Sequence, residues 1–237
     1  MSHPLFRNVT RQEAESILAK APVGEVLLCP GSLVQLGNGI VAELSISWRV
    51  ADGIFQHLPL GEAERPRGQD WLLGRKLYLP AILGNKQQLD RFEDVDEIVG
   101  RRIEPIVGLL QEAQMCPKYL RISGEGHEAA MAQIKHHLRS QAQANPSRTP
   151  YCLSLSVRVP GSLLLSHPGG HELVKVDPRG FVLVKGPGGE EEVFERLERM
   201  IDYFKRNYQR FVRVNSESEK NSVRDEDPRN KYQQFMN

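Results

Sequence analysis

The sequence has few cysteines, no long apolar run and almost no net charge, and each absence excludes a class of protein. Its three cysteines, Cys29, Cys116 and Cys152, lie far apart and form no Cys-x-x-Cys pair. Free thiols in a reducing compartment are therefore favoured over a disulfide framework. No stretch reaches the roughly 20 apolar residues that cross a membrane. The start, MSHPLFRNVT, lacks the apolar core of a signal peptide.

Charge and composition restrict the partners of the chain. Lysine and arginine number 31 against 30 acidic residues, which leaves a net charge of +1 and no overall field for nucleic acid. Any anionic ligand must therefore be held by local clusters. The 237 residues, 40% hydrophobic and 26% charged, are typical of a globular protein with one large or two small domains.

The same order of elements is predicted twice: a helix, a run of short strands, then a second helix. The first copy runs from Thr10 to about Leu110, and the second from about Glu128 to Tyr208. This order predicts an α+β fold with two open antiparallel sheets, each flanked by two helices. Such sheets offer loop-rimmed pockets for a peptide rather than a bed for a cofactor. Recognition is therefore favoured over catalysis, and no cofactor is expected.

Local signals define the first copy. Thr10 and Glu13 have the spacing of a capping box, which predicts a helix start. Asp52-Gly53 predicts a hairpin between two alternating strands. Pro105 should kink or break the second helix, because it lacks the backbone N–H that a helix interior needs. The predicted elements are strands at 25–28, 44–50, 54–60 and 75–79, a long loop at 33–43, and a second helix marked by apolar positions from 92 to 106.

The second copy begins after a joining segment at residues 116–126. Its last helix has the clearest apolar stripe, from Val193 to Tyr208. From Asn215 onward the chain is polar and mixed in charge, which predicts a disordered tail. The other predicted elements are a helix marked by Ala130, Ile134 and Leu138 and strands at 152–157, 162–166, 172–176 and 180–184.

Signals for catalysis or metal binding are weak. His167 and His171 have the spacing of zinc ligands on a helix, but the Pro-Gly-Gly between them forbids that helix. Gly186-Pro187-Gly188-Gly189 lacks the lysine and hydroxyl that would complete a phosphate loop. No serine or cysteine is set for nucleophilic attack. We expect a protein that is not an enzyme and binds no metal.

One segment points to a specific fold. Gly24–Ser32 reads as a buried strand ending in a Ser/Gly loop, after a capped helix and before a Trp-bearing strand and a Gln-His strand. That is how a Src homology 2 (SH2) domain begins. The words HPLFRNVTRQEAE, LSISWRVADGIFQH, LLGRKLYL, FEDVDEIVGRRIEPI and PYCLSLSVRVPGSLLL together resemble the tandem SH2 module of the Suppressor-of-Ty six family of transcription elongation factors and histone chaperones.

This resemblance covers about Pro4 to Tyr208 and implies a nuclear function. It predicts an N-terminal SH2 domain at residues 3–120, a non-standard SH2 domain at 121–212 and a tail at 213–237. In the family, the module docks on the phosphorylated linker between the body and the C-terminal repeats of the largest RNA polymerase II subunit. The N-terminal half takes phosphothreonine and a nearby tyrosine, and the C-terminal half takes phosphoserine. No membrane or small-molecule partner is expected, and direct nucleic-acid binding is not expected either.

The resemblance also implies site residues. Ser32 matches a phosphate-loop serine and His57 the histidine of the Gln-His strand, while Lys118 and Lys175 match positions for lysines that hold the second phosphate. Each residue also has an alternative role without a ligand. Ser32 fits the cap of a turn, His57 fits a hydrogen-bonded core histidine, and both lysines fit ordinary solvated positions.

Cys29 is the serious departure from the family, which has arginine at this position. A thiol cannot supply the planar, permanently charged fork of arginine. Either the first pocket has lost phosphate binding, or Arg49 or Arg11 replaces the missing cation; Cys29 itself fits a small buried hydrophobe. Two alternative functions remain open, a cytoplasmic phosphotyrosine adaptor and a phosphorylation-independent nucleic-acid or structural module.

Overall fold

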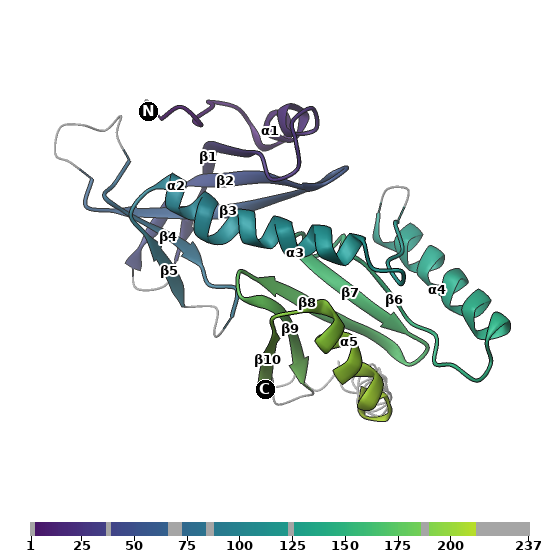
Figure 1. Cartoon of the computed structure of the whole chain (residues 1–237). Helices are drawn as coiled ribbons and strands as arrows, with labels where there is room; N and C mark the ends of the chain where they lie inside the picture. Colours follow the sequence, from purple (N-terminus) through teal and green to yellow (C-terminus); the bar gives the residue numbers. More distant parts are fainter. Residues whose placement is uncertain are drawn as a thin grey trace, which may run out of the picture.

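The computed structural model contains two five-stranded antiparallel sheets with helices packed on their faces (Figure 1). It describes residues 3–36, 39–65, 73–83, 88–122, 126–185 and 190–211. The strand order is β1-β2-β3-β4-β5 in the first sheet and β10-β9-β8-β7-β6 in the second. The predicted class, mixed helix and antiparallel sheet in two similar halves, is therefore confirmed. Across these ranges, no helix is long and apolar enough to cross a membrane.

The first half follows the predicted order closely. Thr10 caps the first helix, and both hydrogen bonds of the capping box with Glu13 are formed. The Asp52-Gly53 hairpin joins its two strands where expected. One strand, β5, was not predicted. The elements are α1 Arg11–Leu18, β1 Val26–Gln35, β2 Val41–Ala51, β3 Ile54–Ala63, β4 Lys76–Pro80 and β5 Leu89–Phe92.

The predicted loop at residues 33–43 is wrong, because most of it is strand. β1 continues to Gln35, and β2 already begins at Val41. The register shifts between Pro30 and Val34, so the chain bulges there and then resumes pairing. The sequence signal was misleading because Pro30 and Gly31 are typical of a strand end, whereas here they form a bulge.

The long helix after β5 contains a wider turn instead of a break. It consists of α2 Val95–Ile98, the π-helical turn η2 Val99–Ile103 and α3 Glu104–Gln114. Pro105 lies in the first turn of α3, directly after η2. A proline cannot donate the usual i→i−4 hydrogen bond, and a π turn is one way for a helix to continue past it. The predicted disruption is therefore local.

The last helix of the second half begins later than predicted. Val193 and Phe194 belong to strand β10, where they pair with Val182 and Phe181 of β9. Apolar residues at these two positions suit either a strand or a helix, and tertiary pairing decides the outcome. The tail after Asn215 lies outside the described residues. The elements are α4 His127–Ala144, β6 Cys152–Leu155, β7 Ser162–His167, β8 Gly170–Asp177, β9 Gly180–Lys185, β10 Glu190–Phe194 and α5 Leu197–Arg206.

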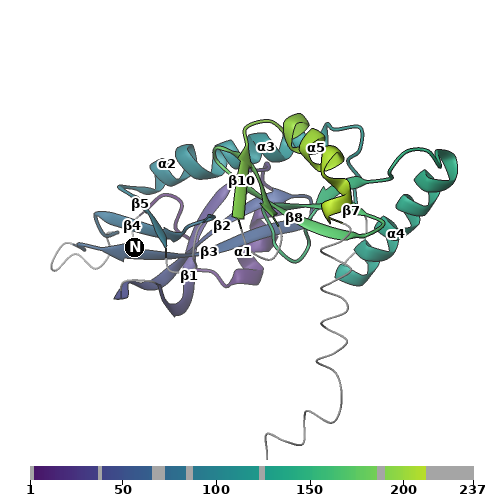
Figure 2. The same ribbon diagram turned by 90° about the horizontal axis from the view of Figure 1, so that it is seen from below.

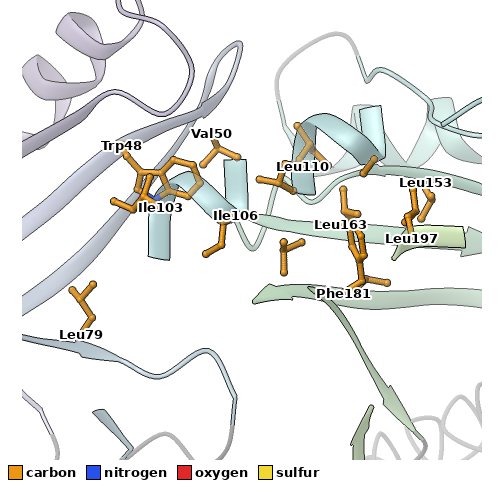
Figure 3. Packing of buried hydrophobic residues seen from close by; sticks show 14 of the residues in the cluster. Trp48, Val50, Leu79, Ile103, Ile106, Leu110, Leu153, Leu163, Phe181 and Leu197 are labelled. Carbon is orange, nitrogen blue, oxygen red and sulfur yellow. The ribbon is translucent and has the colours of Figure 1, made fainter. Parts of the chain in front are cut away.

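Helices cover both faces of the paired sheets. α2, α3 and α5 lie on one side, whereas α1 and α4 lie on the opposite side (Figure 2). One continuous core joins the halves: Trp48 and Ile106 belong to the same buried cluster as Leu163 and Phe181 (Figure 3). The α3 helix packs directly on strands β8 and β9 of the second sheet. The two sheets are therefore held at a fixed position relative to each other.

Polar contacts reinforce this junction. The Gln56 side chain donates to the Pro160 carbonyl over 2.9 Å, and it also accepts from the Trp48 indole over 2.9 Å. Arg121 pairs with Asp52 over 2.6 Å. Because buried and exposed contacts cross the junction together, the halves should behave as one unit.

We expect the chain to unfold in one cooperative transition. Leu110→Ala should lower the free energy of unfolding by about 2–5 kcal/mol, since Leu110 is buried in the common core. Met115→Ala is the control, because Met115 is 85% exposed just beyond the same helix. Urea denaturation followed by tryptophan fluorescence and far-UV circular dichroism tests this. Two separate transitions, or early proteolysis between residues 116 and 126 into stable fragments, would contradict it.

Candidate functional site

A pocket of about 690 Å³ opens between α1 and the first sheet. Its walls come from the segment before α1, the first turn of that helix, the β1 bulge and strands β2 and β3. Gly31 is required at the bulge, because a Cβ there would lie 2.8 Å from the backbone of Leu44. The polar or charged lining residues are Asn8, Thr10, Arg11, Glu13, Cys29, Ser32, Ser45, Ser47 and His57.

The structure brings four of the five residues predicted for the first half to this pocket. Arg11 lies at the start of α1, Cys29 on β1, Ser32 in the bulge and His57 on β3. These residues are far apart in sequence, and pairing of β1, β2 and β3 is what gathers them.

Arg49 does not line the pocket. Its guanidinium donates to the Ala21 carbonyl and pairs with the Asp52 carboxylate, where β2 ends. Ala21 lies between α1 and β1, and Asp52 lies in the hairpin turn between β2 and β3. Arg49 thus stabilises the contacts between β2, the segment after α1 and the hairpin turn, whereas Arg11 lines the pocket.

Cys29 gives the pocket an uncharged wall. Its side chain is buried and packs with Ala14 and Leu18 of α1. Burial raises the pKa of the Cys29 thiol, and a hydrogen bond with Ser47 opposes that rise. The thiol therefore stays protonated at neutral pH, where an arginine would carry a full positive charge.

His57 belongs to a chain of four polar side chains. The Ser47 hydroxyl lies 2.8 Å from His57 Nδ1, and His57 Nε2 lies 2.9 Å from Glu15 Oε1. The same carboxylate oxygen accepts from Arg11 Nε over 3.2 Å. Ser47 and Glu15 were not predicted from the sequence. The available signals were the spacing of four between Arg11 and Glu15 on one helix and the cross-strand pairing of Ser47 with His57.

Burial and the nearby Arg11 charge favour the neutral imidazole. Burial lowers the pKa of His57, the nearby Arg11 charge lowers it further, and Glu15 partly opposes both effects. Among the lining residues of this pocket in the described ranges, Arg11 is the single permanent cation, and it is already paired with Glu15. The pocket thus has the hydroxyls and shape for a polar side chain but little positive charge.

In the second half, two lysines lie close to one aromatic ring. Lys118 Nζ is 5.3 Å and Lys205 Nζ 5.9 Å from the centroid of the Tyr151 ring. Lys118 also donates to Gln141 of α4 over 3.4 Å, and Lys205, about half exposed, approaches Asp202 at 3.4 Å. Lys205 was not predicted, because sequence alone does not show which face of α5 turns toward Lys118.

Lys175 lies elsewhere in the second half. Its Nζ donates to Glu191 over 2.6 Å and to the Ile82 carbonyl of the first half over 3.2 Å. Within the part of the chain that the structure describes, Lys175 and Lys118 share no hydrogen-bond partner. Lys118 and Lys205 thus share the Tyr151 ring, whereas Lys175 lies at the junction between the halves.

The two histidines of the His-x-x-x-His spacing have separate environments. His167 is buried against the rings of Phe204 and Tyr208, whereas His171 bonds to Ser166 over 2.9 Å. Within the described ranges, no group of three His, Cys, Asp or Glu side chains is arranged to hold a metal ion.

Comparison of the sequence with known protein families assigns this chain to one of them. The SH2 domain family profile matches residues 1–207. This chain belongs to the SH2 domain family. The match includes α1 and the first sheet, and so every residue that lines the pocket between them.

The sequence relatives of the chain include transcription elongation factors. The chain is 29% identical to transcription elongation factor SPT6 of Drosophila melanogaster over 88% of its own length and 26% identical to the Arabidopsis thaliana SPT6 homolog over 86%. It spans about a tenth of the length of these relatives, 10% and 11%.

Two solved structures have a similar fold. One is the tandem SH2 domain of transcription elongation factor Spt6 described as binding the phosphorylated RNA polymerase II C-terminal repeat domain, with a TM-score of 0.63 at 21% identity. The other is the tandem SH2 domains of Antonospora locustae Spt6, with a TM-score of 0.59 at 20% identity. Each alignment covers 86% of this chain and 93% of the other.

The His57 environment predicts a specific pH dependence. Since its folded-state pKa lies below the ordinary value of about 6.5, the unfolded chain binds a proton more readily. The stability that neutral His57 contributes is therefore present above about pH 6.5 and is lost as the pH falls through the folded-state pKa. Imidazole NMR titration should show this low pKa.

Glu15→Gln should lower the pKa of His57 further, because it removes the group that raises it. Glu25→Gln is the control, since Glu25 is an exposed carboxylate outside this chain of contacts. A His57 pKa above 6.5 in the native protein, or an increase in Glu15→Gln, would show that the contacts described here do not control the imidazole.

Proposed function

We propose that this chain is the phosphopeptide-binding module of a transcription elongation factor and that it docks on the phosphorylated largest subunit of RNA polymerase II. The observation that carries the proposal is the nature of its relatives: proteins from fly and plant that match both halves of the chain are SPT6 elongation factors. The module is a non-catalytic interaction domain, and its place of action is the nucleus.

The lysine pair supports phosphate binding in the second half. Lys118 and Lys205 bring two ammonium groups to the same ring, and Lys205 is about half exposed. A phosphate between them would accept charge-assisted hydrogen bonds, each worth roughly 1.5–3 kcal/mol when well formed. We propose that Lys118 and Lys205 hold a phosphoserine and that Lys175 mainly stabilises the junction.

The first pocket supports a weaker role. Ser32 is exposed in the β1 bulge, and Arg11 is the neighbouring cation. Cys29 removes the bidentate partner on which an SH2 pocket ordinarily relies. We propose that this pocket binds a threonine-phosphorylated segment weakly, through Ser32, Arg11 and backbone amides of the bulge.

The target segment within the polymerase subunit is the finer part of the proposal. The sequence resemblance implies the linker before the C-terminal repeats, whereas the structural neighbour is described as binding the repeat domain itself. Both are phosphorylated segments of one subunit, so a peptide panel should include both. We favour the linker, since two separate phosphate sites suit a segment with isolated phosphoresidues.

Binding to the lysine pair should depend on phosphate. In calorimetric titrations, Lys118→Gln and Lys205→Gln should each weaken a linker peptide carrying phosphothreonine and phosphoserine by at least about tenfold. Lys175→Gln, the matched control on β8, should change affinity by less than about threefold. The peptide panel contains linker and repeat sequences, each with and without phosphate.

Two results would contradict this assignment. A larger loss of peptide affinity in Lys175→Gln than in the other two variants would show that Lys175 belongs to the second phosphate site. Equal binding of phosphorylated and plain peptides, together with a steep salt dependence of RNA binding, would favour the nucleic-acid module instead. Preference for phosphotyrosine peptides over both polymerase segments would favour the adaptor.

Restoring the missing cation should strengthen the first pocket. Cys29→Arg should improve the affinity for a threonine-phosphorylated linker peptide by about tenfold or more, because an ionised bidentate pair replaces a neutral thiol. Cys29→Met is the matched control, because it adds length without charge. Titration of phosphorylated and plain threonine peptides measures both effects.

Variants of the two native arginines complete this test. Arg11→Ala should lower the affinity for the threonine-phosphorylated peptide, whereas Arg49→Ala should leave that affinity unchanged. If native protein, Cys29→Arg and Arg11→Ala all bind phosphorylated and plain threonine peptides equally, the first half binds no phosphate. Loss of binding in folded Arg49→Ala would instead show that Arg49 has replaced the strand arginine.

A further inference from the structure

A second pocket, of about 270 Å³, lies between α4 and the second sheet. Its walls come from the N-terminal half of α4, the turn between β6 and β7, and strands β7 and β8. Most of its lining is apolar, unlike that of the first pocket. The lining residues are His127, Ala130, Met131, Ile134, Leu155, Ser156, Val157, Arg158, Val159, Leu164, His171 and Leu173.

This pocket occupies the same place in its half as the first pocket does in the other. In the first sheet, Ser47 and His57 are cross-strand partners joined by a 2.8 Å contact between Oγ and Nδ1. In the second sheet, Ser166 and His171 are cross-strand partners with the same two atoms 2.9 Å apart. The paired serine and histidine therefore align the two sheets residue by residue.

The alignment shows how the chemistry differs. Two residues along from the Ser47–His57 pair, the first pocket is lined by Ser45 and Pro59, which face each other across β2 and β3. The equivalent residues of the second pocket are Leu164 and Leu173, which face each other across β7 and β8. The hydroxyl of Ser45 in this wall has thus been replaced by an aliphatic side chain, and the wall becomes wholly aliphatic.

The rim of the second pocket is also apolar. Val157 and Val159 are 38% and 42% exposed on the turn after β6, which corresponds to the bulge that carries Ser32. The Val159 amide donates to the Ser156 hydroxyl over 3.0 Å, so the serine organises its own turn. Arg158 is exposed between the two valines and gives the rim a positive charge that suits an acidic or phosphorylated peptide.

The second pocket lies on a route between the two proposed phosphate sites. α1 and α4 lie on the same side of the sheets (Figure 2), so both pockets belong to one face. The β6–β7 turn contacts β3 through the 2.9 Å hydrogen bond from Gln56 to the Pro160 carbonyl. Gln56 precedes His57 in the sequence, and its side chain lies on the other face of the strand, beside Trp48. At the other end of α4, Gln141 contacts Lys118. A peptide that follows the α1 and α4 face from the first pocket to Lys118 would pass this pocket.

We propose that the second pocket binds a large apolar side chain of the phosphopeptide, at a point between its two phosphorylated residues. The inference rests on the proposed function, since it takes the same peptide as the occupant. The volume suits one aromatic or large aliphatic side chain, and the leucine walls with exposed valines supply the apolar surface it would bury. The second half thus contributes an apolar anchor in addition to its lysine pair.

Methionine-methyl NMR provides a direct test. The protein has five methionines, and Met131 lines the pocket, whereas Met200 is fully buried in α5 on the opposite side. Addition of the doubly phosphorylated linker peptide should shift the Met131 methyl signal, assigned through Met131→Leu, and leave the Met200 signal in place. Replacing the peptide's large apolar residues by alanine, one at a time, should identify one whose loss abolishes the Met131 shift.

A rim variant gives an independent measure. Val159→Glu should lower the affinity for the peptide by about tenfold, because a charge at the rim opposes burial of an apolar side chain beside it. Val193→Glu is the matched control: Val193 is 39% exposed on β10. Both positions are on the surface, so both variants should keep the native fold, as circular dichroism can verify.

The outcomes separate the two proposals. If the peptide binds through its phosphates but neither the Met131 signal nor the affinity of Val159→Glu changes, the second pocket is empty in the complex and the inference is wrong. If no methyl signal moves and calorimetry detects no binding, the proposed function fails, and the inference fails with it.

Discussion

The packing of α3 between the two sheets is the constraint on which the rest of the structure depends. Neither small sheet has a large core of its own, and a single buried cluster extends from Trp48 through Ile106 and Leu110 to Phe181. Small domains bury a small fraction of their surface and are only marginally stable alone, so a shared helix lets each half bury more apolar surface. We therefore expect one rigid body with a fixed distance between its pockets.

The first pocket shows a second physical constraint, the cost of a buried charge. An arginine at position 29 would lie on a wall that α1 covers, and without a phosphate it would be a desolvated cation. Cys29 removes that cost, and Glu15 can then pair with Arg11 and His57. The pocket is therefore stable when empty, and for the same reason we expect it to bind phosphate only weakly.

The sequence predicted those features that depend on local chemistry. The Thr10 capping box and the Asp52-Gly53 hairpin need only neighbouring residues, and both are present. Where tertiary contacts decide, prediction failed: Val193 is in a strand because β9 is available to pair with it. The candidate site divides in the same way. Strand pairing gathers Cys29 and His57 as expected, whereas the pairing of Lys118 with Lys205 depends on how α5 packs.

The two halves keep one scaffold and vary the surface that it presents. The serine–histidine pair across the second and third strands of each sheet fixes the same geometry twice, while Ser45 in one half and Leu164 in the other give that geometry different chemistry. A weak polar pocket, an apolar pocket and two lysines around one shared core can act together on the proposed phosphopeptide, because the first contact raises the effective concentration of the peptide at the others. With Cys29 in the first pocket, such a peptide would still be held, since its affinity is distributed over several contacts. Rigidity at the junction is what makes that distribution work: if the halves moved freely, each added contact would lose part of its advantage to the entropy of ordering them.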